Sequence, residues 1–87
     1  MAKYDIEIKR SAVKEINKIP RKYLQNILSK IDLLKNEPRP ANSKKLSGKE
    51  LYRIRFGQYR IVYQIMDTKL IVYIVKIGHR KNVYKQI

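Results

Sequence analysis

A run of alternating residues in the second half of the chain limits the fold more than any other feature. Apolar and basic side chains alternate through LYRIRF from residue 51, and an alternating run resumes as YRIVYQI after Gly57-Gln58. A period of two is typical of a half-buried strand, and a glycine-containing pair between two such runs is typical of a tight turn. The pattern therefore predicts a β-hairpin.

The turn also predicts the register of this hairpin. If Gly57-Gln58 forms the loop, Phe56 lies opposite Tyr59 and Arg55 lies opposite Arg60. One face then collects apolar and aromatic side chains: Tyr52, Ile54, Phe56, Tyr59, Ile61, Tyr63 and Ile65. The other face carries three arginines: Arg53, Arg55 and Arg60.

Arginines that face each other across a hairpin repel, so this face requires a compensating partner. Guanidinium groups fit phosphate oxygens, which favours an anion site over the alternative of a solvated outer face. Further basic residues follow at the end of the next predicted strand: His79, Arg80 and Lys81. The three residues strengthen the case for an anion site.

Two helices and two further strands are predicted around the hairpin. Residues 4–9 (YDIEIK) alternate like a strand, and residues 69–77 (KLIVYIVKI) are apolar on both faces, as in a central strand. Pro20 separates two helical patterns, which should form an antiparallel hairpin. The second pattern has the spacing of a buried stripe: Leu24, Ile27, Leu28, Ile31 and Leu34.

The resulting order, β-α-α-β-β-β, predicts an α+β fold. We expect residues 1–87 to form a single domain, in which the helical hairpin packs on one face of a small antiparallel sheet. The first strand should lie beside the last, because the last is the most apolar. The arginines should occupy the sheet face away from the helices.

The charge of the chain indicates a polyanionic partner. There are 21 Lys+Arg against 7 Asp+Glu, a net charge of +14, which suits nucleic acid, a ribosome or an acidic protein. The segment 38–49 is a loop by composition, and it is either a mobile linker or one wall of a groove for a phosphate backbone. In the second case its lysines join the arginine hairpin: Lys44, Lys45 and Lys49.

Several classes of function are disfavoured. The chain has no cysteine, one histidine and scattered acids, so we expect neither a metal nor a small-molecule cofactor. No phosphate-binding glycine loop or nucleophile elbow occurs. The absence of a long apolar run predicts no membrane span and no signal peptide, and hence a cytoplasmic protein.

Cationic chemistry on a phosphodiester remains. Cleavage of RNA by its own 2′-OH needs a base, an acid and positive donors around the phosphorane, and arginines supply the donors. Arginine stays charged and is a poor proton carrier. The candidates for proton transfer are His79, Tyr84 and a lysine such as Lys45 or Lys81.

The segments GQYRIVYQI and KIGHRKNVY resemble the RelE family of type II toxins, within the RelE/ParE superfamily. The resemblance covers essentially the whole chain. It implies an mRNA interferase, a metal-independent endoribonuclease that cuts the codon in the ribosomal A site and so inhibits translation. It also implies an acidic antitoxin of the RelB type, which wraps the toxin.

The resemblance assigns roles to individual residues. Arg60 matches the arginine thought to stabilise the transition state, and Arg80 and Tyr84 match the arginine and tyrosine of the family's C-terminal motif. Arg53 and Arg55 stand where the best-known bacterial members have lysines. These arginines, with Lys81 and the loop lysines, are expected to bind RNA and the ribosome.

The sequence departs from the family in ways that leave the acid and the base open. Arg80 and Tyr84 are closer together than in the bacterial members, and His79 replaces a lysine, so it becomes a candidate for proton transfer. Two alternatives remain. One is a ParE-like toxin that inhibits DNA gyrase and is no nuclease; the other is an inactive relative that binds its antitoxin and nucleic acid.

Overall fold

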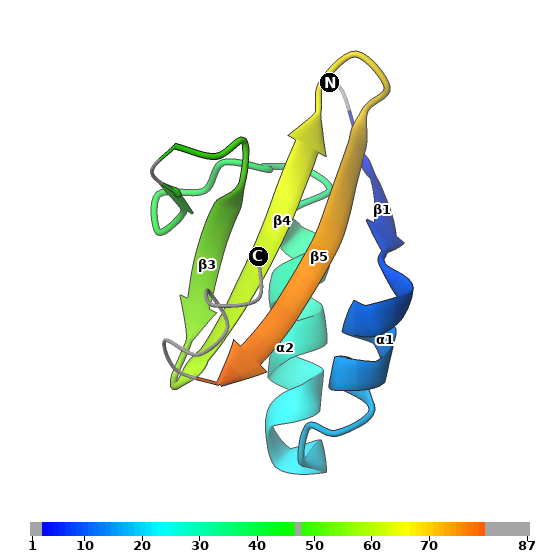
Figure 1. Cartoon of the computed structure of the whole chain (residues 1–87), viewed down its shortest axis with the longest axis vertical. Coiled ribbons are helices and arrows are strands. Elements are labelled where there is room, and N and C mark those ends of the chain that lie inside the picture. The colour runs from blue at the N-terminus through cyan, green and yellow to red at the C-terminus, as the bar shows by residue number, and fades with distance from the viewer. Residues whose placement is uncertain (1–2, 47, 80–87) are drawn as a thin grey trace.

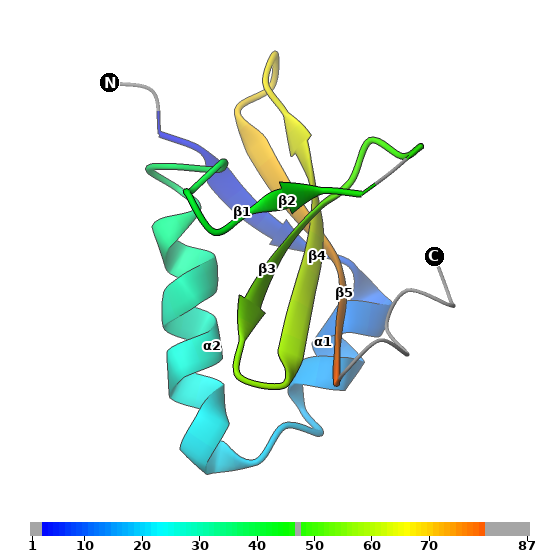
Figure 2. The ribbon, with the colours of Figure 1, turned by 90° about the vertical axis from the view of Figure 1, so that its left-hand side faces the viewer.

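Two helices cover one face of a five-stranded sheet (Figures 1 and 2). The structure, a computed structural model, describes residues 3–46 and 48–79. The strand order is β1-β5-β4-β3-β2. The elements are β1 (Asp5–Ile8), α1 (Arg10–Ile16), α2 (Arg21–Leu33), β2 (Lys44–Lys45), β3 (Tyr52–Phe56), β4 (Tyr59–Met66) and β5 (Ile71–His79).

The predicted α+β class and the position of the first strand beside the last are confirmed. The sheet is mixed, however, because β1 and β5 are parallel, with Asp5 opposite Ile71 and Ile8 opposite Ile74. Figure 1 shows the reason: the helices return the chain to the end of the sheet where β1 begins, so β1, β3 and β5 all run the same way. The expectation of an all-antiparallel sheet was wrong on this point.

The segment predicted to be a loop contains a short fifth strand. Lys44 pairs with Arg53 and Lys45 pairs with Tyr52, so β2 extends the sheet beyond β3. Two residues are too few to show an alternation in the sequence, and the pairing depends on β3, which is distant along the chain.

Helix α2 buries a narrower stripe than its sequence predicts. Ile27, Ile31 and Leu34 are buried, whereas the side chain of Leu28 is 41% exposed. A helix turns by about 100° per residue, so Leu28, directly after Ile27, projects to the side of the stripe that faces the sheet. The prediction that Leu28 belongs to the buried stripe was therefore wrong.

Tyr63 brings a polar group into the core, and the hydrogen bond of that group is satisfied. Tyr63 is fully buried, and its hydroxyl donates to the carbonyl oxygen of Pro38 at 2.8 Å. Burial raises the pKa of Tyr63 to about 12. The bond ties the start of the 38–43 segment to β4.

A second contact holds the same segment at the sheet. The Arg39 guanidinium donates to both carboxylate oxygens of Asp67, at 2.9 and 3.3 Å, and its Nε donates to the Tyr52 hydroxyl at 3.3 Å. The Tyr4 hydroxyl donates to Asp67 at 2.7 Å. Hydrogen bonds from Arg39 and Tyr4 hold the pKa of Asp67 below its usual value. We call these four residues the Asp67 clasp.

The end of β5 continues beyond β1 and is covered by α1. The Glu15 carboxylate accepts the backbone N–H of Ile77 at 3.1 Å and pairs with the Lys76 ammonium at 2.5 Å. Glu15 therefore satisfies a strand edge that β1 does not reach, as protected sheet edges require. This contact positions the last residues of β5, which lie beside the tip of the β3–β4 hairpin.

Candidate nucleic-acid interface

The predicted register of the β3–β4 hairpin is confirmed. Arg55 lies opposite Arg60, and Phe56 lies opposite Tyr59. The turn depends on Gly57, whose φ of 58° lies in the left-handed region that side chains with a Cβ rarely adopt. The register fixes which side chains share each face of the sheet.

Four basic residues of β2, β3 and β4 share the face away from the helices. Lys44 lies opposite Arg53 across β2 and β3, and Arg55 lies opposite Arg60 across β3 and β4. Directly paired residues project on the same face, and residues two apart on one strand do so as well. We call Lys44, Arg53, Arg55 and Arg60 the cationic face.

The other predicted lysines of the loop lie elsewhere. Lys45 pairs with Tyr52, so its register position belongs to the helix-covered side, and its ammonium lies 3.6 Å from the Glu50 carboxylate. Lys49 is exposed between β2 and β3, just after Gly48. Among the loop lysines, the sheet register therefore groups Lys44 with the arginines.

Charge is divided across the open face of the sheet. Asp5 and Glu7 of β1 pair with Ile71 and Tyr73, which places both acids at the edge far from β3. Val62 lies between Arg53 and Lys76 and is fully buried. An acidic edge at β1 and a basic edge at β2, β3 and β4 favour binding of a polyanion on the β2–β3–β4 side of this face.

His79 lies apart from the cationic face. It pairs with Tyr59, on the aromatic side of the hairpin, and its ring meets the Tyr59 ring edge-on at 5.1 Å. Gly78, by contrast, is the residue opposite Arg60. The sequence predicted that His79 would converge on the arginines, and the structure does not bring them together.

A register shift in β5 accounts for this placement. Tyr63 pairs with Ile74 but Val62 pairs with Lys76, so Val75 is the extra residue of a bulge. One extra residue moves all later side chains to the opposite face. The bulge sends Ile77 into the core, keeps Lys76 out of it, and carries His79 from the arginine side to the aromatic side.

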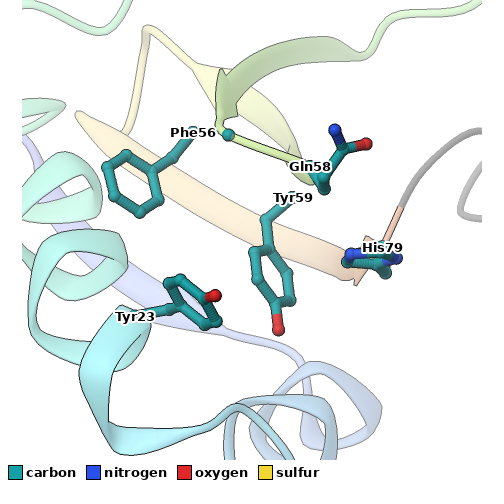
Figure 3. Close-up of a pocket in the computed structure, with 6 residues that line it drawn as sticks. Tyr23, Phe56, Gln58, Tyr59 and His79 are labelled. Atoms are coloured by element: carbon teal, nitrogen blue, oxygen red, sulfur yellow. The ribbon is translucent and has the colours of Figure 1, made fainter.

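An aromatic pocket lies under the hairpin tip on that side (Figure 3). Its volume is about 320 Å³, and its lining residues are Tyr23, Phe56, Gly57, Gln58, Tyr59 and His79. The rings of Tyr23 and Tyr59 are tilted, with centroids 5.7 Å apart. Sequence reasoning missed Tyr23, because this α2 residue lies off the apolar stripe and the pocket forms only on folding.

Three predicted site residues, Arg80, Lys81 and Tyr84, lie outside the described residues. Within the described ranges, no group of three or more His, Cys, Asp or Glu residues is placed to hold a metal ion. None of the described helices is long and apolar enough to cross a membrane.

Comparison with known proteins places the chain. Residues 6–84 match the model of the ParE toxin family of type II toxin–antitoxin systems. A Methanocaldococcus jannaschii protein described as a candidate RelE1 toxin is 32% identical over 87 residues, 95% of this chain and 97% of that protein. The mRNA interferase toxin RelE of Escherichia coli K12 is 28% identical over 81 residues, 91% of this chain and 85% of that protein.

A solved structure agrees with these relatives. RelE in the archaeal RelE–RelB complex from Pyrococcus horikoshii OT3 superposes with a TM-score of 0.81 and 30% identity, covering 93% of this chain and 98% of that one. The chain belongs to the ParE toxin family of type II toxin–antitoxin systems, and it resembles the RelE members of that superfamily along nearly its whole length.

Proposed function

We propose that this chain is an mRNA interferase, a toxin that cuts ribosome-bound messenger RNA and so inhibits translation. The observation that carries the proposal is the cationic face, where Lys44, Arg53, Arg55 and Arg60 are in register. A face of this kind matches the spaced phosphates of a single strand. The name of the E. coli relative supports the same activity.

In the proposed reaction, the 2′-oxygen of a ribose attacks the adjacent phosphorus and the bond to the 5′-oxygen breaks. The products are a 2′,3′-cyclic phosphate and a free 5′-OH. Arg60 donates hydrogen bonds to the phosphorane oxygens as their charge grows. No metal takes part in this scheme.

The proton transfers require other residues, because a guanidinium does not release its proton. We assign Arg80 to the phosphorane as a second cation, and Tyr84 to the region of the scissile bond, from the match of both to the family motif. His79 was a candidate for proton transfer. Its position beside Tyr59 supports a binding role instead.

The ribosome is proposed to hold the message in the geometry that cleavage requires. The described residues provide charge but no strong base, so the free chain should be a poor nuclease. A ribosome that holds the message in a reactive geometry lowers the entropic part of the barrier. Lys49, Arg53 and Lys81 are proposed to contact RNA or the ribosome.

The proposed partner is an acidic antitoxin of the RelB type in the cytoplasm. The Pyrococcus structure is a complex of RelE with RelB. A net charge of +14 favours an acidic chain, since opposite charges steer and specify association. Binding would also offset the self-repulsion of the toxin.

One alternative has a specific observation in its favour. The matching family model is named for ParE, and ParE-like members inhibit DNA gyrase without cutting RNA. The three in-register arginines favour the nuclease, because an inhibitor that only binds a protein has no need of a phosphorane-binding face.

The test is cell-free translation with the purified chain, with cuts on the message mapped by primer extension in the presence and absence of ribosomes. We expect cuts on ribosome-bound message alone. A parallel gyrase supercoiling assay should show no inhibition. Intact message together with inhibited gyrase would overturn the proposal in favour of the ParE-like activity.

A further inference from the structure

The aromatic pocket under the hairpin tip takes no part in the proposed cleavage. We propose that it binds one unstacked nucleobase of the message while the cationic face holds the neighbouring phosphates. The inference rests on the proposed function, since it assumes that RNA lies on this hairpin. It adds a base-binding site on the aromatic side of the hairpin, across the tip from the cationic face that contacts the backbone.

The shape of the pocket suits a planar ring. Phe56 and Tyr59 come from the hairpin and Tyr23 from α2, and Figure 3 shows their three rings around one space. The volume of about 320 Å³ lies at the lower end of the range for small-ligand sites. Tyr23 is 37% exposed, so its ring is accessible to a ligand.

The chemistry of the lining suits a nucleobase better than a purely apolar group. Aromatic rings stack with every base, whereas hydrogen-bonding groups at the rim read base edges. The pocket has both, because the Tyr23 hydroxyl and the His79 imidazole lie beside the Tyr59 ring (Figure 3). These groups can donate to and accept from a base.

The position of the pocket connects it to the phosphates. Phe56 follows Arg55 and Tyr59 precedes Arg60, so the two rings that the hairpin contributes to the pocket are each one residue from a member of the cationic face. The tip between them is open: a Cβ built on Gly57 would meet nothing within 4 Å. A strand crossing the tip can therefore leave its phosphates on the arginines and turn one base into the pocket.

The test measures binding of a short ribonucleotide by the full chain. The probe carries one 2-aminopurine, whose fluorescence is quenched on stacking, and 2′-O-methyl groups that remove the attacking hydroxyl. The chain contains no tryptophan, which limits background fluorescence. A second probe of equal length has an abasic site in place of the 2-aminopurine and is followed through an end label.

The critical variants are Tyr23→Leu, which removes the ring, and Tyr23→Phe, which removes only the hydroxyl. We expect Tyr23→Leu to weaken binding of the 2-aminopurine probe about tenfold and to abolish its quenching, as loss of a stacking partner does elsewhere. Tyr23→Phe keeps the ring, so it should quench as the wild type does and lose at most about threefold in affinity, the modest cost of one hydrogen bond. The abasic probe should bind all three chains equally, about tenfold more weakly than the intact probe binds the wild type.

Two results would overturn the proposal that the pocket binds a base. One is Tyr23→Leu with wild-type affinity and quenching. The other is an equal loss for the abasic and intact probes, which would indicate a structural effect on the hairpin rather than contact with a base. Wild-type cleavage of ribosome-bound message is measured separately, so a chain that binds the base but does not cut would contradict the proposed function and leave the pocket standing.

Discussion

The two faces of the β3–β4 hairpin are built from alternate residues of the same short sequence, yet one face is basic and the other belongs to the core. One face carries Arg53, Arg55 and Arg60, and the other buries Ile54 and Ile61 against the helices. The stability of the fold therefore depends on one set of side chains and the proposed chemistry on the other. Substitutions one residue apart should separate the two properties.

The largest effect is expected on the buried face. Ile61→Asp places a charge where the wild-type side chain is fully buried, and it should abolish cooperative unfolding or cost about 4 kcal/mol or more. Thermal and urea melts followed by circular dichroism measure this. Leu28→Asp is the matched control on the exposed side of α2, and it should retain a cooperative transition. A normal melt for Ile61→Asp would refute the assignment of faces.

An intermediate effect is expected on RNA binding, where the two lysines of β2 should differ. Lys44 shares the cationic face, whereas Lys45 pairs with Tyr52 and contacts Glu50. For a single-stranded RNA, Lys44→Ala should reduce the slope of log affinity against log salt by about 0.7, the value for one phosphate contact. Lys45→Ala should leave the slope unchanged. Equal slopes for the two variants would break the distinction between the faces.

The smallest effect concerns the Asp67 clasp, which ties the basic loop to the sheet. Because the pKa of Asp67 is lowered in the folded chain, its contribution to stability is present above the unfolded pKa and is lost as pH falls through the folded value. The Tm advantage of the wild type over Asp67→Asn should therefore be present at pH 7 and shrink below about pH 4. Asp32→Asn controls for the loss of one acidic charge. An advantage that grows on acidification would contradict the clasp.

The same hairpin shows what a sequence can and cannot predict. Its register follows from local residues, because Gly57-Gln58 and the alternation around them lie next to one another. The α+β class and the position of β1 beside β5 also follow from patterns of burial. The parallel direction of β1 and the pairing of β2 depend on the path of the chain between distant segments, which periodicity does not encode.

In the candidate site, too, the residues set by local pairing were predicted and those set by tertiary packing were not. The arginines of β3 and β4 were placed correctly because their strands pair locally, whereas His79 was placed on the wrong side because of the bulge at Val75. The bulge places Ile77 in the core and keeps the charged Lys76 out of it, so the bulge is a consequence of core packing. The pocket needs Tyr23 of α2 as well, and no sequence spacing links that residue to Tyr59.

The central claim is that the cationic face carries the cleavage. Single-turnover cleavage of ribosome-bound message by the wild type, Arg60→Ala and Lys45→Ala tests it most directly, with a melt to show that each variant is folded. We predict that Arg60→Ala cuts about 10²–10³-fold more slowly, the usual cost of removing one donor to a transition-state oxyanion, and that Lys45→Ala cuts within about threefold of the wild type. A folded Arg60→Ala variant that cuts at the wild-type rate would contradict the claim.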